Sequence, residues 1–103
     1  MRIGVARMRV LIVGGGGREH SLAIGLSGSP SVDSIHTAPG NAGTGKLGVN
    51  HDIGSSDIEG LVGLAREIEA DLVVVGPEAP LVLGLADKLR EIGIPCFGPH
   101  SEG

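Results

Sequence analysis

Most of the residues in this sequence that could do chemistry lie in three loops rich in glycine, proline and polar side chains. The first, residues 14–20, reads GGGGREH and directly follows an apolar run. The second, residues 39–43, reads PGNAG, and the third, residues 76–80, reads GPEAP after the run LVVV. A glycine-rich turn between a strand and a helix can bind a dinucleotide, a simple phosphate or no ligand at all.

The first loop does not fit the dinucleotide-binding fingerprint G-x-G-x-x-G/A. Counting from Gly14, the sixth position is Glu19, and neither it nor the next residue, His20, is the small residue that close strand–helix packing needs. The acidic residue expected at the end of the second strand is also missing, because Asp33 stands at its start. A P-loop is excluded because no Gly-Lys-Ser or Gly-Lys-Thr closes the run.

The same loop retains the pattern of a general anion site. Amides of residues 15–18 at a helix start can bind a phosphate or carboxylate, since the helix dipole favours negative charge there. Arg18 could add a charge-assisted hydrogen bond. The alternative is that the glycines only form a tight turn and Glu19 only favours the helix N-terminus. The spacing alone leaves both interpretations open.

The other two loops have similar alternatives. Glu78 could face a ligand and hold hydroxyls or an ammonium group, or it could be a solvated acid while Pro77 and Pro80 shape the turn and the helix start. Asn41 could orient a polar substrate, or PGNAG could be a plain loop. Cys96 is expected to be a small core residue rather than a reactive thiol.

The elements that must position these loops alternate along the chain. Apolar runs predict strands at 9–13, 32–38, 72–75 and 94–97. Helical periodicity predicts helices at 18–27 and 56–68, and a third helix that follows GPEAP and ends at Gly93. Residues 44–53 are predicted to be a loop with one short strand. Two helix ends have specific signals: a capping box at Ser56 and a left-handed turn at Gly28.

This alternation predicts an α/β fold, a Rossmann-like half of a doubly wound parallel sheet with helices on both faces. All three loops then fall at the carboxyl ends of strands, the edge at which open α/β sheets bind ligands.

The composition excludes several other classes. The net charge is −4 without a basic stripe, and Phe97 is the only aromatic residue, so a nucleic-acid surface is not expected. Cys96 is the only cysteine, which excludes an internal disulfide, and the four histidines lack metal-ligand spacing, so no metal site is expected. No segment of the sequence could span a bilayer or serve as a cleavable signal. We therefore expect one cytoplasmic domain.

Taken together, four segments resemble a known family: MRVLIVGGGGREHSLA, APGNAGT, DLVVVGPEAPLVLGLAD and FGP. In this order and spacing they are similar to the N-terminal, pre-ATP-grasp domain of the glycinamide ribonucleotide synthetases, or phosphoribosylamine–glycine ligases. The resemblance runs from Met8 to Pro99. It implies an N-terminal extension at residues 1–7 and a substrate-binding domain at residues 8–103.

The resemblance implies an ATP-dependent ligase of de novo purine synthesis. In the complete enzymes, ATP and Mg²⁺ (or Mn²⁺) activate glycine as an acyl phosphate, and the amine of 5-phosphoribosylamine attacks it. The N-terminal domain is expected to help form the phosphoribosylamine site, while ATP and metal bind chiefly in the ATP-grasp domains, supplied in cis or in trans. No cofactor is expected to bind tightly to this chain.

Carried over by position, the resemblance implies a role in substrate binding for each of the three loops. Arg18 would lie near the substrate phosphate, Glu19 would brace the loop, and Glu78 would hold the ribose hydroxyls or the amine. The full set of expected substrate-binding residues is Gly14, Gly15, Gly16, Gly17, Arg18, Glu19, Asn41, Gly43, Gly76, Pro77 and Glu78.

One departure from the family limits this expectation. The family continues past FGP into an ATP-grasp region, whereas this sequence stops at Gly103. We therefore expect no catalytic residue here and no ligase activity from this chain alone, because positioning and charge neutralisation around metal and phosphates supply most phosphoryl-transfer catalysis. The alternative is a free-standing nucleotide- or phosphosugar-binding module.

Overall fold

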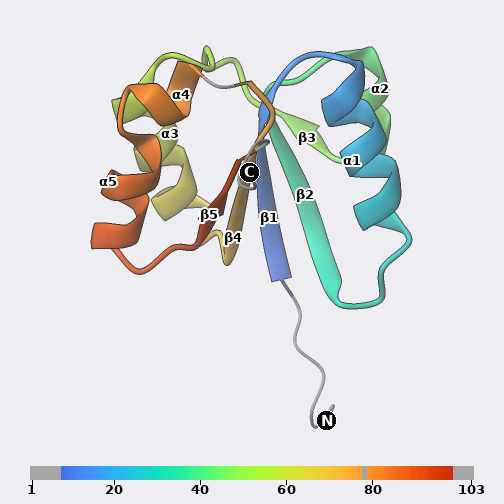
Figure 1. Cartoon of the computed structure of the whole chain (residues 1–103). Helices are drawn as coiled ribbons and strands as arrows, with labels where there is room; N and C mark the ends of the chain where they lie inside the picture. The colour runs from blue at the N-terminus through green and yellow to red at the C-terminus, as the bar shows by residue number, and fades with distance from the viewer. Residues whose placement is uncertain (1–7, 78, 99–103) are drawn as a thin grey trace, which may run out of the picture.

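The computed structural model describes residues 8–77 and 79–98, with the backbone alone for Leu81 and Val82. Five parallel strands form one sheet in the order β3-β2-β1-β4-β5 (Figure 1). The strands are β1 (Met8–Gly14), β2 (Val32–Pro39), β3 (Val49–Asn50), β4 (Leu72–Val75) and β5 (Cys96–Phe97). The predicted Rossmann-like α/β fold is confirmed.

The helices divide between the two faces of the sheet (Figure 1). On one face α1 (Gly17–Ser27) packs against β1 and β2, and α2 (Ala42–Leu47) packs against β2 and β3. On the other face lie α3 (Ile58–Glu67), α4 (Ala79–Val82) and α5 (Leu85–Glu91). The central strand β1 therefore has helices on both sides, which is why its run of four apolar residues is buried.

Side chains alternate between two cores, as the period of a strand requires. Val10 and Ile12 of β1 pack with Ala23 of α1. Leu11 and Val13 face the other way, into a core shared with α3 and α5. The loops after β1, β2 and β4 all leave the carboxyl edge of the sheet, the upper edge in Figure 1. We call this the loop edge.

The segment predicted as a loop with one short strand contains a helix as well. Residues 42–47 form α2 before the short strand β3. The prediction was wrong because AGTGKL holds two glycines and is only 6 residues long, too short to show helical periodicity. The helix depends instead on its cap: the side chain of Asn41 accepts a hydrogen bond from the amide of Thr44 at 2.9 Å.

Three expected helix ends also differ. The cap of α3 is Asp57 rather than Ser56, and its carboxylate accepts from the amide of Gly60 at 3.0 Å. Gly28 ends α1 with a right-handed φ of −86°, not in a left-handed turn. The predicted third helix is divided into α4 and α5, because Gly84 has a left-handed φ of 95°. Gly93 follows α5 with a φ of 83°, as predicted.

Candidate functional site

The three loops singled out by the sequence meet at the loop edge. The amide of Gly40 donates to the carbonyl of Gly14 at 3.0 Å, which joins the second loop to the first. The Arg18 side chain reaches the carbonyl of Gly76 and joins the first loop to the third. Glu78 lies outside the described residues, so its predicted role stays a prediction. Pro77 is half-buried directly after Gly76.

Glu19 is the buried acid of this edge. Its side chain is only 5% exposed, although the four residues before it are exposed. Oε1 of Glu19 accepts a hydrogen bond at 2.7 Å from the amide of Gly16, the residue that precedes α1. This bond satisfies one of the free donors at the helix start and places a negative charge by the positive end of the helix dipole. The glutamate that breaks the dinucleotide fingerprint thus folds back to hold its own loop.

Two of the glycines leave room for this glutamate. A Cβ on Gly14 would lie 2.7 Å from Cδ of Glu19, and a Cβ on Gly76 would overlap Oε2 of Glu19. Gly14 also has a φ of +137°, a conformation that L side chains rarely adopt. The carboxylate therefore lies between the end of β1 and the end of β4, where only glycine backbone can approach it.

Arg18 lies next to Glu19 and makes a second bond to the third loop. Its Nη1 donates to the carbonyl oxygen of Gly76 at 3.0 Å, while the residue remains exposed. A guanidinium has five N–H donors, so one hydrogen bond leaves four for solvent or an anion. Arg18 is thus held in place from one side and accessible from the other.

Asn41 connects the second loop to the first. Its Nδ2 donates to the carbonyls of Gly15 and Gly16 at 3.1 and 3.0 Å, while its Oδ1 accepts from the amide of Thr44. Both ends of the amide group are therefore used within the protein. In this structure Asn41 fixes the path of the glycine loop, and its side chain has no free polar end for a ligand.

Three residues at this edge were missed by the sequence interpretation. Thr44 is fully buried, and its Oγ1 accepts from the amide of Asn41 at 2.8 Å and lies 2.8 Å from Oδ1 of Asn50. The ring of His20 lies so close to Gly43 that a Cβ there would come within 2.5 Å of it. The spacing Asn41-x-x-Thr44 is typical of a helix cap and could have revealed the first of these contacts.

The exposed turn of α1 is the part of the edge that can bind an anion. The first amides of a helix have no intrahelical acceptor, and within the described residues no other group accepts from those of Gly17 and Arg18. Both residues are exposed. Free donors, the helix dipole and the guanidinium of Arg18 all favour a phosphate or carboxylate at this point.

Two histidines that showed no sequence pattern meet away from the loop edge. Nδ1 of His36, on β2, lies 2.9 Å from Nε2 of His51, and their rings are stacked. Burial, followed by the neighbouring His51 and Arg9, holds the pKa of His36 below its usual value. No group of three possible metal ligands occurs in the described part of the chain, so these two rings form a pair only.

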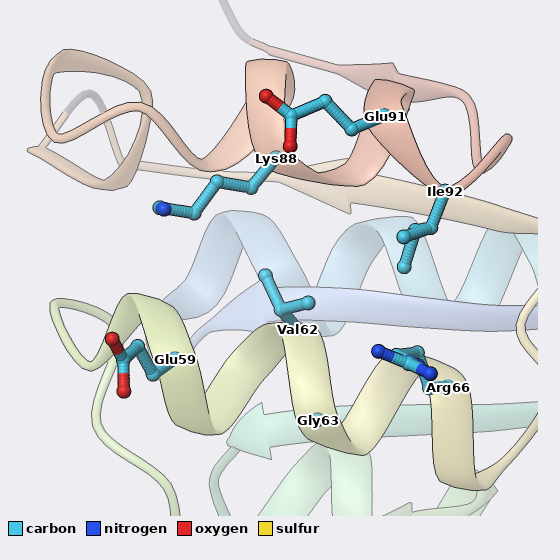
Figure 2. Close-up of a pocket in the computed structure, with 7 residues that line it drawn as sticks. All are labelled: Glu59, Val62, Gly63, Arg66, Lys88, Glu91 and Ile92. Carbon is cyan, nitrogen blue, oxygen red and sulfur yellow. The ribbon is translucent and has the colours of Figure 1, made fainter.

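A groove of about 340 Å³ lies between α3 and α5, and Figure 2 shows its lining. Glu59 and Arg66 of α3 face Lys88 and Glu91 of α5, with Val62 between them. The groove contains none of the residues predicted for substrate binding, and its acids and bases balance. The groove therefore has no preference for a phosphate.

Among the helices of the described residues, none is long and apolar enough to cross a membrane.

Comparison with known proteins identifies the family. The family described as phosphoribosylglycinamide synthetase, N domain, matches residues 8–103. A phosphoribosylamine–glycine ligase of Mycobacterium tuberculosis is 53% identical over 95 residues, which cover 92% of this chain and 22% of the relative. Ligases of the same name from Allochromatium vinosum and Streptomyces coelicolor are 55% and 52% identical and are covered over 22% and 23% of their length.

These matches include every loop of the edge described above. The chain spans about a fifth of the length of the relatives it matches, so the likeness concerns this domain. The chain belongs to the family of phosphoribosylglycinamide synthetase N domains.

Proposed function

We propose that this chain is the substrate-binding N-terminal domain of an ATP-dependent ligase that joins glycine to 5-phosphoribosylamine in purine biosynthesis. The observation that carries the proposal is the exposed first turn of α1 with Arg18, at the loop edge of a chain whose relatives are named phosphoribosylamine–glycine ligase. The 5-phosphate of the substrate supplies the negative charge that this turn favours.

The fixed shape of the loop supports this proposal. Glu19 and Asn41 hold the backbone of Gly15 and Gly16. The exposed residues that follow, Gly17 and Arg18, therefore start from a backbone that is fixed without a ligand. A site that needs no rearrangement loses less conformational entropy on binding. Arg18 would then complete the phosphate contact through its remaining donors.

The residues divide into two proposed roles. Gly17 and Arg18 would touch the phosphate, and Glu78 with Pro77 would hold the ribose hydroxyls or the amine from the third loop. The remaining predicted residues would keep the loops in position: Gly14, Gly15, Gly16, Glu19, Asn41, Gly43 and Gly76. Their contacts with Glu19, His20 and one another support this second role.

The complete ligase would need more chain than these 103 residues. We propose that residues 8–103 form one domain after a short extension, and that ATP and Mg²⁺ or Mn²⁺ bind to an ATP-grasp region in cis or in trans. Small-molecule substrates and a cytoplasmic place of action belong to the same proposal. This chain alone should form no glycinamide ribonucleotide when mixed with ATP, Mg²⁺, glycine and phosphoribosylamine.

The test is a titration of the chain with ribose 5-phosphate, followed by amide NMR. The amides of Gly17 and Arg18 should shift, and replacing Arg18 with Gln should weaken binding at least tenfold while ribose alone causes no shift. A matched control is Arg66→Gln, which removes an exposed arginine from the α3–α5 groove and should leave the affinity unchanged. Shifts caused by NAD but not by ribose 5-phosphate would refute the proposal and favour a free-standing nucleotide-binding module.

A further inference from the structure

Within the described residues 8–77 and 79–98, half of one face of the sheet has no helix packed over it. The helices α1 and α2 pack on β1, β2 and β3, whereas β4 and β5 on that side carry apolar side chains without such a cover. Leu72 and Val74 are half-buried and pack at the margin of the α1 core. Phe97 pairs in register with Val74, so it points to the same face, and it is 57% exposed. The only aromatic residue of the chain is therefore at the surface.

The adjacent flank of α1 is also apolar and hollow. Arg18 reaches from α1 to Gly76 after β4, which shows that this flank faces β4. Below Arg18 the flank forms a groove of about 360 Å³ lined by Ser21, Leu22, Gly25 and Leu26. We call this groove and the bare part of the sheet together the apolar trough, with Leu22, Gly25, Leu26, Leu72, Val74 and Phe97 as its members.

The spacing of the strands leaves room for one helix over β4 and β5. Because α1 lies over β1 and β2, a helix over β4 and β5 would be two strand spacings away, roughly 9.6 Å. Packed helices keep their axes roughly 8–10 Å apart. A helix in the trough would thus contact α1 on its side and β4 and β5 below it, which would complete the two-sided cover of the sheet.

We propose that an apolar helix from the remainder of the ligase docks in this trough. The relatives supply the occupant, since 78% of the Mycobacterium tuberculosis protein lies outside the 22% that matches this chain. Gly25 favours close approach of that helix, because nothing lies within 4 Å of a Cβ built there. The inference rests on membership of the family and not on the identity of the ligand at the loop edge.

The test uses a chimera in which residues 8–103 replace the matching segment of the Mycobacterium tuberculosis ligase, compared with the chain by itself. Gly25→Leu fills the trough. In the chain alone it should raise the Tm by about 2–6 °C, because leucine favours a helix more than glycine and nothing lies within 4 Å of the added Cβ. In the chimera it should lower the Tm by about 3–8 °C, because the added side chain displaces the docked helix.

Two further variants make the result decisive. Gly63→Leu is the matched control: Gly63 also has nothing within 4 Å of an added Cβ, but it lines the α3–α5 groove. It should raise the Tm of both proteins. Phe97→Ser should leave the chain alone almost unchanged and lower the Tm of the chimera. If Gly25→Leu and Phe97→Ser leave the chimera unaffected, or if Gly63→Leu alone lowers its Tm, the proposal is wrong.

The same variants test whether a second copy of the chain, rather than a helix of the ligase, occupies the trough. Sedimentation of the isolated chain should give a monomer. A dimer that Gly25→Leu and Phe97→Ser both dissociate would overturn the proposal. Binding of ribose 5-phosphate at the loop edge is measured independently of all these results, so the docking and the proposed function fail separately.

Discussion

The two halves of the loop edge are held in different ways. The loop after β2 is tied to the loop after β1 by Asn41, which donates to the carbonyls of Gly15 and Gly16. Within the loop after β1, Glu19 accepts a further hydrogen bond from the amide of Gly16. The loop after β4 joins them in the described residues only at Gly76, through Arg18 and Glu19. Beyond it, α4 has 4 residues and Gly84 divides it from α5.

The two ways of holding the loops suit two different ways of binding a ligand, through backbone amides and through side chains. A loop that must present backbone amides in one geometry benefits from several independent bonds, since each removes a way for the chain to deviate. In the proposed function the third loop would contribute side chains rather than amides to the ligand, so one point of attachment would suffice. Gly76 is that point, and substitutions there should have the largest effect.

Replacing Gly76 with Ala should break the contact between the two halves. A Cβ on Gly76 would overlap Oε2 of Glu19, and both residues are buried. We expect the free energy of unfolding to fall by about 3 kcal/mol, because the added methyl group overpacks the site and also displaces the Glu19 carboxylate from its hydrogen bond. Urea denaturation of the chain measures it. Gly17→Ala is the control, because an added Cβ meets nothing within 4 Å, and a loss of the same size there would show that the steric argument is wrong.

Substitution of Glu19 should have the second-largest effect on the free energy of unfolding. Glu19→Ala removes the acceptor for the amide of Gly16 and leaves a small cavity between Gly14 and Gly76. We expect a loss of about 2 kcal/mol in the free energy of unfolding. Glu19→Gln keeps the shape and one carbonyl oxygen for the same amide, so it should lose about half as much. Equal losses for both variants would mean that the charge near the helix dipole, rather than the hydrogen bond, stabilises the loop.

A substitution at Asn41 can distinguish its two roles, which are to cap α2 and to bind the carbonyls of the first loop. Asn41→Asp keeps the oxygen that accepts from Thr44 but loses the two donors to the glycine carbonyls. We expect the free energy of unfolding to fall by about 1–2 kcal/mol. We also expect weaker binding of ribose 5-phosphate, because Glu19 is then the only side chain of the described residues that still holds the backbone of Gly16. Calorimetric titration and urea denaturation measure the two effects. Unchanged affinity would show that the second loop does not organise the first.

The sequence predicted the alternation of strands and helices, the parallel sheet and the meeting of the three loops at one edge, because buried strands and glycine-rich turns are local patterns. It did not predict α2, which has no apolar periodicity and depends on Asn41 and Thr44. It also missed the division of the last helix at Gly84, since a left-handed glycine after an otherwise regular helical pattern is visible only in the backbone.

The site was predictable as a list of residues but not as a set of contacts. Glu19 stood out because it violates the dinucleotide fingerprint, yet nothing in the sequence shows that its carboxylate lies against Gly76, 57 positions away in the chain. The pair of His36 and His51 has no motif either, since it arises from the pairing of β2 with β3. Contacts between distant segments require the register of the strands, which composition and periodicity do not specify.

The pair of His36 and His51 gives the smallest expected effect on stability. It tests whether contacts between β2 and β3 stabilise the half of the molecule that carries the first two loops. Burial, then His51 and Arg9, lowers the pKa of His36 from 6.5. The unfolded chain therefore binds a proton at higher pH than the folded one, so stability is complete above about pH 6.5 and is lost as the pH falls below it. Urea denaturation between pH 7.5 and 5 should show this decrease, and His36→Asn should reduce it. If the decrease persists in full without His36, protonation of His36 is not its cause, and the contact between β2 and β3 at this residue does not make stability depend on pH.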